Sequence, residues 1–322
     1  MKIAFVGKGG SGKTTLASLF TGYLAAAEHP VLAIDADINQ HLAAALGATE
    51  DEAAALPTLG DNLDLIKDYL RGDNPRISGT GAMIKTTPPG RGSRLLTPFE
   101  DNPISAACMR TVGGVRLAVT GRFAEQDLGV ACYHSKVGAA ELLLNHLVDD
   151  AGEYVVMDMT AGADAFASGL FTRFDMTFLV CEPTVRSVGV YRQYSGYARD
   201  FGVRLAVVGN KVTDADDVAF LRDQLGDDLH GWMLASGHVR AAERGQARSI
   251  SELEPHNLET LRAMHSTVDA SDRDWERYQR QAIEFHLRNA GAWGNDRAGE
   301  DLSAQVDPDF VLGPPLLAGR EA

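Results

Sequence analysis

Short apolar runs alternate with longer segments of helical composition along most of the chain. The runs occupy residues 2–7, 31–37, 115–120, 154–159, 176–182 and 203–210. Apolar runs of this length, separated by helices, are typical of strands buried on both faces of a parallel sheet. The helices predicted by the intervening segments span residues 13–27, 38–47, 136–150, 187–201 and 214–226. The pattern therefore predicts an α/β fold, with a predominantly parallel β-sheet and helices on both faces.

Two regions interrupt this alternation. Residues 72–111 contain clusters of Gly and Pro and few apolar runs, which predicts a long insertion or flexible loop. Near the C-terminus, a polar helix predicted over Ser271–Asn289 leads into a Pro-containing tail that is either poorly ordered or docked on another part of the protein. We therefore predict one domain over residues 1–268, followed by a C-terminal helical and irregular extension over residues 269–322.

Composition narrows the range of partners. The 322 residues include 44 Asp and Glu against 30 Lys and Arg, a formal net charge of −14, and no basic cluster stands out, so nucleic acid is not an expected partner. A membrane is not expected either, because the sequence has no apolar run of about 18 residues and no apolar terminal helix with basic flanks. Three widely spaced cysteines argue against a disulfide framework, and we expect a reducing, cytoplasmic location.

A phosphate-binding loop follows the first predicted strand. Residues 7–14 satisfy the spacing G-x-x-x-x-G-K-[ST] between a strand and a helix. In such a loop the backbone N–H groups hold phosphates, Lys13 reaches the β and γ oxygens, and the Thr14 hydroxyl ligates Mg²⁺. A tight glycine turn with a surface lysine is the alternative, but it does not account for the complete spacing in that setting. The predicted nucleotide ligands in the loop are Gly9, Gly10, Ser11, Gly12, Lys13, Thr14 and Thr15.

A second lysine in the loop, Lys8, is not needed to hold phosphate. It is either a solvated loop lysine or a source of charge for a transition state, as an arginine finger is. The loop K-G-G-x-G-K-[ST] resembles that of the deviant Walker A ATPases, which are P-loop NTPases of the SIMIBI type. This group includes the ParA/MinD partitioning ATPases, the nitrogenase iron protein and the CooC-type nickel-insertion accessory ATPases of carbon monoxide dehydrogenase. The resemblance implies an ATP-dependent homodimer in which Lys8 of one subunit contacts the nucleotide bound to the other.

Acidic residues end two of the predicted strands, at the edge of the sheet where open α/β folds bind ligands. Asp158 ends the run Val155–Met157, the pattern of a Walker B residue that holds Mg²⁺ through water. By the family resemblance, Asp37 orients the attacking water and Asp35 supports lysine or Mg²⁺ contacts. Ile38 stands where the family usually has Pro, and the alternative is that these are solvated acids at strand ends. Lys8, Lys13 and Asp37 are thus the predicted catalytic residues.

Two further segments resemble nucleotide-sensing elements of the same group. Residues 158–162, DMTAG, resemble a switch II in which the amide of Gly162 senses the γ-phosphate. Asn210 and Lys211 end another strand at the position where family members read the base with an Asn amide. The loop Leu234–His238 is expected to complete that base pocket.

Cys132 and His134 are the best lead to what the protein works on. CooC-type ATPases carry a C-x-C at this place, where two copies meet across the dimer to hold a metal, and this chain has His134 for the second Cys. Two Cys and two His from a dimer form a tetrahedral site suited to Zn²⁺ or Ni²⁺. The alternative is that Cys132 is a small apolar filler and His134 an ordinary loop histidine.

The motifs together indicate an enzyme that hydrolyses ATP with Mg²⁺. The resemblance, which spans about residues 1–250, implies a dimeric switch that couples hydrolysis to metallocentre maturation or to delivery of a metal or protein client, with a metalloenzyme as one such client. The second interpretation is a positioning ATPase of the ParA/MinD kind that acts on DNA, membrane or a protein. A shared iron–sulfur cluster is disfavoured, because no Cys follows Asp158 within the switch segment.

Overall fold

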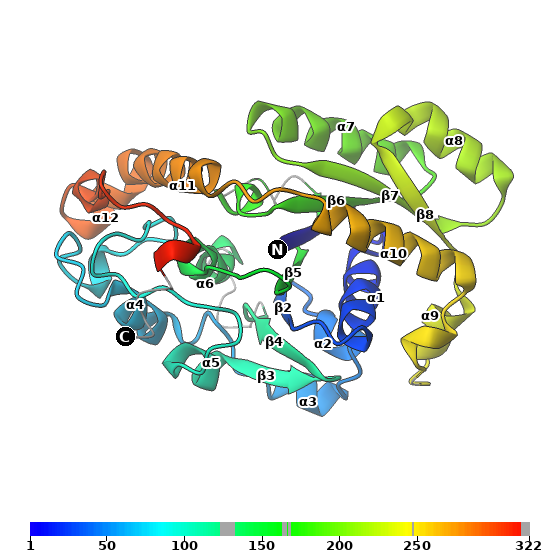
Figure 1. Ribbon diagram of the computed structural model, residues 1–322, viewed down its shortest axis with the longest axis horizontal. Helices are drawn as coiled ribbons and strands as arrows, with labels where there is room; N and C mark the ends of the chain where they lie inside the picture. The colour runs from blue at the N-terminus through cyan, green and yellow to red at the C-terminus, as the bar shows by residue number, and fades with distance from the viewer. Residues whose placement is uncertain (123–132, 163–165, 167–168, 247, 317–322) are drawn as a thin grey trace.

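A mostly parallel sheet forms the centre of the computed structural model, which describes residues 1–122, 133–162, 166, 169–246 and 248–316 (Figure 1). The strands are β1 (Lys2–Gly7), β2 (Val31–Ala36), β3 (Met109–Val112), β4 (Val115–Val119), β5 (Tyr154–Met159), β6 (Met176–Cys181), β7 (Leu205–Val212) and β8 (Leu229–Leu234). They form one eight-stranded sheet in the order β3-β4-β2-β5-β1-β6-β7-β8. The β3–β4 pair is antiparallel and the other pairs are parallel. The predicted fold class is confirmed.

Helices cover both faces of this sheet. They are α1 (Lys13–Ala26), α2 (Leu42–Ala45), α3 (Glu50–Ala54), α4 (Leu63–Arg71), α5 (Pro103–Cys108), α6 (Tyr133–His146), α7 (Val185–Asp200), α8 (Ala215–Leu225), α9 (Gly237–Ala242), α10 (Pro255–Asp269), α11 (Trp275–Asn289) and α12 (Asn295–Ala298). Alternate residues of β1 enter different cores: Ile3 and Phe5 pack with Phe20 of α1, and Val6 packs in the cluster that contains Leu143 of α6. This alternation explains why the whole strand is apolar.

The helix predicted over residues 38–47 is wrong in extent. The structure contains the four-residue helix α2 there, and residues 37–41 form a loop. The Asp37 carboxylate accepts a hydrogen bond from the Asn39 backbone N–H at 2.9 Å, and Gln40 adopts a left-handed φ of 50°. An Asp that captures a nearby backbone N–H competes with helix formation, and this local contact overrides the helical pattern.

The segment 72–111 is folded and packed, so the expectation of a flexible loop is wrong. Ile77, Met83, Leu96 and Ile104 are almost completely buried in the core shared with the central sheet. The segment also supplies α5 and the edge strand β3. Single apolar residues spaced between Gly and Pro carry this packing, and they leave no periodic pattern in the sequence.

The described part of the C-terminal tail, up to residue 316, is docked, the second of the two predicted alternatives. Figure 1 shows the orange and red end of the chain, from α11 onward, beside the cyan segment that follows α4. The Asp307 carboxylate accepts hydrogen bonds from Arg91 Nε at 2.8 Å and Nη2 at 3.1 Å. Leu302 packs in a small buried cluster with Ile84 and Ala290. The extension and the 72–111 segment therefore stabilise each other.

A buried ion cluster joins the extension to the sheet. Asp149 forms ion pairs with Lys2 at 3.2 Å and with Arg273 at 2.8 Å, the latter residue lying just before α11. Burial alone raises the pKa of Asp149, but the charges of Lys2, the α-amino group of Met1 and Arg273 outweigh it and lower that pKa to about 2.

Across the described residues, no helix combines the length and apolar character that crossing a membrane requires.

We expect Leu302→Ala to lower the free energy of unfolding by about 2–5 kcal/mol, because it leaves a cavity where a fully buried side chain was. It should also speed proteolytic release of the C-terminal tail, measured beside chemical denaturation. Val311 lies on the same tail with its side chain 75% exposed, so Val311→Ala is the matched control and should change stability by less than about 0.5 kcal/mol. Equal small effects of both substitutions would show that tail docking does not contribute to stability.

Candidate functional site

The chemistry-bearing residues gather at one edge of the sheet because parallel strands end together there. Asp35 at the end of β2 is in register with Asp158 at the end of β5, and Phe5 of β1 is in register with the same Asp158. The loop that follows β1 leads directly into α1. The structure thus brings the phosphate-binding loop and both strand-end acids to one place, as the sequence predicted.

The loop of residues 7–12 needs glycine at two positions. A Cβ on Gly7, which has a φ of 148°, would lie 2.5 Å from Val180 O, and a Cβ on Gly12, with a φ of 93°, would lie 2.2 Å from Asn210 Nδ2. Gly12 is also the N-cap of α1 and provides no side-chain cap. The N-terminus of this 14-residue helix therefore presents backbone N–H groups and its partial positive charge to an anion.

The carbonyl groups of the loop are held from outside by β7. Asn210 Nδ2 donates to Ser11 O at 2.7 Å, and Lys211 Nζ donates to Gly10 O at 2.7 Å. Lys211 has a left-handed φ of 59°, which is uncommon for a residue with a side chain. With these carbonyls held on the outside of the loop, its N–H groups remain available to phosphate. Asn210 and Lys211 therefore support the loop, a role that the sequence did not predict, and base reading by Asn210 stays a prediction.

Thr14 and Asp158 form the part of the site that suits Mg²⁺. The Thr14 hydroxyl donates to Asp158 Oδ2 at 2.5 Å. The other oxygen, Asp158 Oδ1, is buried and has no hydrogen-bond partner among the described residues. Magnesium prefers oxygen ligands and keeps several waters, so a hydroxyl and a carboxylate side by side at a phosphate site fit it. The described residues contain no cluster of three His, Cys, Asp or Glu able to hold a metal.

Lys13 and Asp37 lie together beside this pair. Lys13 Nζ is 3.8 Å from Asp37 Oδ2, and both side chains are more than nine-tenths buried. The Asp37 carboxylate is fixed by Asn39, whose backbone N–H and side-chain Nδ2 donate to Oδ1 at 2.9 and 3.1 Å. A lysine that reaches phosphate and an acid that orients water would start from this arrangement.

Asp35 shapes the loop between β2 and α2. Its two oxygens accept hydrogen bonds from the backbone N–H groups of Asp37 at 3.1 Å and Leu42 at 2.9 Å. Both side-chain oxygens are thus directed to the backbone, and the predicted support of lysine or Mg²⁺ contacts stays a prediction. Burial raises the pKa of Asp35 to about 7. Burial, together with the charge of Asp35, raises the pKa of Asp158 well above its usual value.

Gly162 follows β5 in a left-handed conformation, with a φ of 71°. Its neighbour Ala161 lies against the phosphate loop, since Ala161 Cβ is 3.9 Å from the position that a Cβ on Gly9 would take. The predicted switch segment therefore lies beside the loop whose ligand it would sense.

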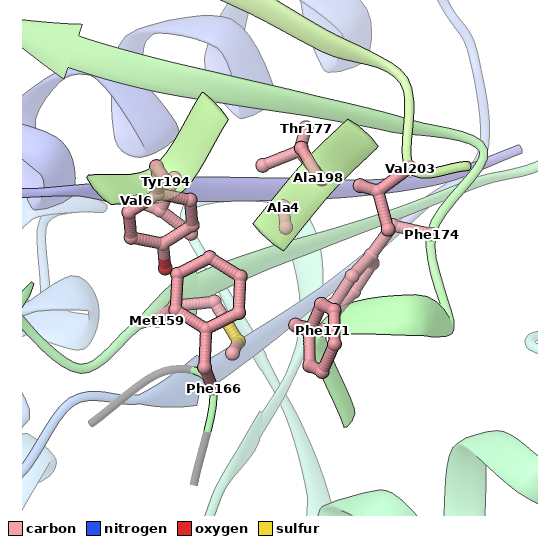
Figure 2. A pocket seen from close by; sticks show the side chains of 10 residues that line it. All are labelled: Ala4, Val6, Met159, Phe166, Phe171, Phe174, Thr177, Tyr194, Ala198 and Val203. Atoms are coloured by element: carbon pink, nitrogen blue, oxygen red, sulfur yellow. The ribbon is translucent and has the colours of Figure 1, made fainter. Parts of the chain in front are cut away.

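An aromatic cluster supports this switch segment from behind. Figure 2 shows Phe166 against Tyr194 of α7 and Met159 of β5 around a small cavity. The ring centroids of Phe166 and Tyr194 are 4.0 Å apart, and Phe166 also packs edge-on against Phe171 at 4.8 Å. The Tyr194 hydroxyl is buried without a hydrogen-bond partner in the described part of the protein. The only sequence signal for this support was the phenylalanine content of residues 166–174.

The loop after β8 is held by a residue that the sequence analysis missed. Glu254 accepts hydrogen bonds from Ser236 Oγ at 2.7 Å and from the Gly237 backbone N–H at 2.8 Å. Ser236 caps α9, and His238 is buried. This loop, Leu234–His238, is ordered by side chains from residues 236–257, and its predicted role in a base pocket is not tested by these contacts.

The proposed metal residues are not brought together by what the structure describes. Cys132 lies outside the described residues, and His134 belongs to the first turn of α6, where the side chain is not described. The metal interpretation therefore stays a prediction. The other cysteines, Cys108 and Cys181, are buried with free thiols.

We expect Asp158→Asn to stabilise the protein without Mg²⁺ at pH 7 by about 1 kcal/mol or more, because it removes a buried carboxyl with a raised pKa. The free energy of unfolding of the wild type should fall as pH rises from about 4 to about 7, since unfolding then releases protons. The variant should lose part of this slope. Added Mg²⁺ should stabilise the wild type and not the variant; a variant less stable than the wild type without Mg²⁺ would contradict this.

Known proteins are similar to this chain in sequence and in fold. Residues 3–269 match the family described as the CobQ/CobB/MinD/ParA nucleotide binding domain. The chain is 30% identical over 248 residues to the carbon monoxide dehydrogenase accessory protein CooC of Rhodospirillum rubrum, a match that covers 76% of this chain and 87% of that protein. It is also 30% identical over 232 residues to an uncharacterized ATP-binding protein of Methanocaldococcus jannaschii, covering 71% and 81% of the two chains.

Solved structures of lower identity share the fold. A putative plasmid partition protein of Borrelia burgdorferi bound to AMPPNP has a TM-score of 0.55 at 14% identity, covering 83% of this chain and 98% of that chain. The cell division ATPase MinD of Pyrococcus furiosus has a TM-score of 0.53 at 14% identity, with the same coverage of 83% and 98%. The predicted P-loop fold and the resemblance to CooC are confirmed. The chain belongs to the CobQ/CobB/MinD/ParA family of nucleotide-binding domains.

Proposed function

We propose that this protein is a Mg²⁺-dependent ATPase that works as a dimeric switch in the cytoplasm. The observation that carries the proposal is the buried Asp158 Oδ1, which has no hydrogen-bond partner among the residues that the structure describes and lies beside the Thr14 hydroxyl at the start of α1. A buried carboxylate oxygen without a partner is costly, and a bound cation would compensate its charge. Membership of a nucleotide-binding family supports ATP as the ligand, and the similarity to the accessory protein CooC supports an accessory role.

Each residue of the site has a role in this reaction. The N–H groups of residues 9–15 and Lys13 hold the phosphates, and Thr14 and Asp158 hold Mg²⁺. When bound, Mg²⁺ neutralises charge on the β- and γ-phosphate oxygens. As Lys13 turns from Asp37 to the phosphates, the Asp37 carboxylate becomes free to orient the water that attacks the γ-phosphate. The amide of Gly162 then senses whether that phosphate is present.

Dimerisation would place Lys8 of one subunit on the nucleotide of the other, as in the group that the loop resembles. The carboxyl edge of the sheet offers apolar contact area, because Ile38, in the loop after β2, is 38% exposed and Val185, at the start of α7, is 75% exposed. Exposed aliphatic side chains beside a charged site suit a face that becomes buried on assembly. The client proposed for this switch is a metalloenzyme or another protein, after the name of the CooC relative.

We expect Lys13→Ala to abolish ATP binding, because the phosphates lose their main side-chain charge. Asp37→Ala should retain ATP, lose hydrolysis by at least about 100-fold and favour the ATP-bound dimer. Equilibrium binding, phosphate release and light scattering measure the three quantities. Asp216→Ala, at an exposed position on α8, is the control and should behave as wild type. Equal loss of ATP affinity in the Lys13 and Asp37 variants would remove the water-orienting role of Asp37.

The proposed switch also carries a metal, Zn²⁺ or Ni²⁺, held by Cys132 and His134 of both subunits. We expect about one metal for every two chains, since a four-ligand site needs both subunits. Cys132→Ser and His134→Ala should each lose this metal, measured by elemental analysis beside the dimer fraction. Cys108→Ala replaces a buried thiol outside the proposed site, and this variant should keep the metal. Metal-free dimers that form with ATP alone would make Cys132 structural and leave a protein client as the proposal.

A further inference from the structure

Glu182 lies between two lysines at the nucleotide edge of the sheet. It follows β6, the strand next to β1, where Gly7 is in register with Val180. Glu182 Oε2 is 3.2 Å from Lys8 Nζ, and Glu182 Oε1 is 2.9 Å from Lys211 Nζ. The Glu182 side chain is 16% exposed, whereas those of Lys8 and Lys211 are 33% and 54% exposed. One partly buried carboxylate therefore holds two more exposed ammonium groups.

The backbone around Glu182 is fixed independently of either lysine. The Glu182 N–H donates to Ser187 Oγ at 3.0 Å, within the first turn of α7. Burial raises the pKa of Glu182, but hydrogen bonds from Lys211 and Lys8 and their charges outweigh burial and lower that pKa. The Glu182 carboxylate is thus ionised and extends from a fixed backbone, whereas Lys8 has the longer and more flexible side chain.

The two lysines differ in how firmly they are held. Lys211 Nζ also donates to Gly10 O at 2.7 Å, so the Lys211 ammonium is held by two partners, Glu182 and Gly10. Glu182 is the acidic partner that the structure gives for Lys8. If Lys8 leaves, Glu182 keeps Lys211 and is not left as an unpaired buried charge, the costly outcome of breaking a single ion pair. Release of Lys8 is therefore the easier of the two separations.

We propose that Glu182 is a positioning residue that holds Lys8 within its own chain and releases it when the nucleotide-bound dimer forms. This inference rests on the proposed ATP-dependent dimer, in which Lys8 must reach across to the other subunit. The partly exposed Lys8–Glu182 pair is weak enough to be exchanged for a triphosphate, whose charge is larger and whose oxygens accept stronger hydrogen bonds. The pair thereby raises the ATP concentration that dimerisation requires.

The contact itself can be tested without nucleotide. Lys8 acylation by an N-hydroxysuccinimide ester, followed by mass spectrometry of the peptide, reports how often its amine is free. Glu182→Gln should raise the rate about two- to five-fold, the range expected for loss of a partly exposed ion pair. Lys211→Gln should lower the rate, because Lys8 is then the one lysine that pairs with Glu182 in the described part of the protein. Unchanged labelling in Glu182→Gln overturns the proposal.

The consequence is tested on the assembled protein. The dimer fraction is measured by light scattering against ATP concentration, and ADP affinity of the monomer is measured separately. Because each dimer releases two Lys8 side chains, Glu182→Gln should raise the dimerisation constant on the order of four- to twenty-five-fold at unchanged ADP affinity. Glu259→Gln removes an equal charge from an exposed pair with Arg262 on α10 and is the control.

The outcomes separate this inference from the function on which it rests. A wild type that forms no dimer at any ATP concentration refutes the proposed switch and this inference with it. A wild type that dimerises while Glu182→Gln shows the same ATP dependence refutes this inference alone. A rise in Glu259→Gln equal to that in Glu182→Gln assigns the effect to net charge and also refutes it.

Discussion

The close pairing of two buried acids governs this site. Asp35 and Asp158 are neighbours on parallel strands because the register of β2 and β5 requires it, and both are fully buried. Asp35 satisfies its oxygens with backbone N–H groups, whereas Asp158 has the Thr14 hydroxyl and one oxygen without a hydrogen-bond partner in the described part of the chain. Their ionisation is therefore opposed until a cation arrives. The proximity of two carboxyl groups costs stability when both are ionised, so a cation bound between them would stabilise the protein.

The phosphate loop is held in shape by strand β7 and by its neighbours. Asn210 and Lys211 bind its carbonyl groups from outside, and the approach is so close that Gly12 admits no side chain. Lys211 then extends this support to Glu182 and, through it, to Lys8. A nucleotide that alters the loop must therefore act on β7 and on the start of α7 as well. The arrangement couples phosphate binding to the surface where a second subunit would contact the site.

Local patterns in the sequence were sufficient for six of the eight strands, for the phosphate loop and for its meeting with Asp37 and Asp158, whereas β3 and β8 were not predicted. The failures have physical causes. The predicted helix over residues 38–47 is shortened because the Asp37 carboxylate accepts a hydrogen bond from the Asn39 backbone N–H. Glu182 carries no motif, since its partners Lys8 and Lys211 are adjacent in space and far away in sequence. The order of residues 72–111 depends likewise on contacts with the extension, which no local pattern records.

The extension beyond the family match packs against residues close to the predicted switch segment. Gly169 admits α11 because it lacks a side chain: a Cβ there would lie 2.8 Å from Phe285 Cγ. The Phe285 ring packs against Phe171 at 5.8 Å and Phe201 at 5.4 Å, and Phe171 in turn packs against Phe166. Interiors packed this closely do not absorb a shift locally. A rearrangement of the residues after β5 must therefore move α11 or open the aromatic cluster, and α11 leads to the tail, which contacts the segment between Arg76 and Leu95.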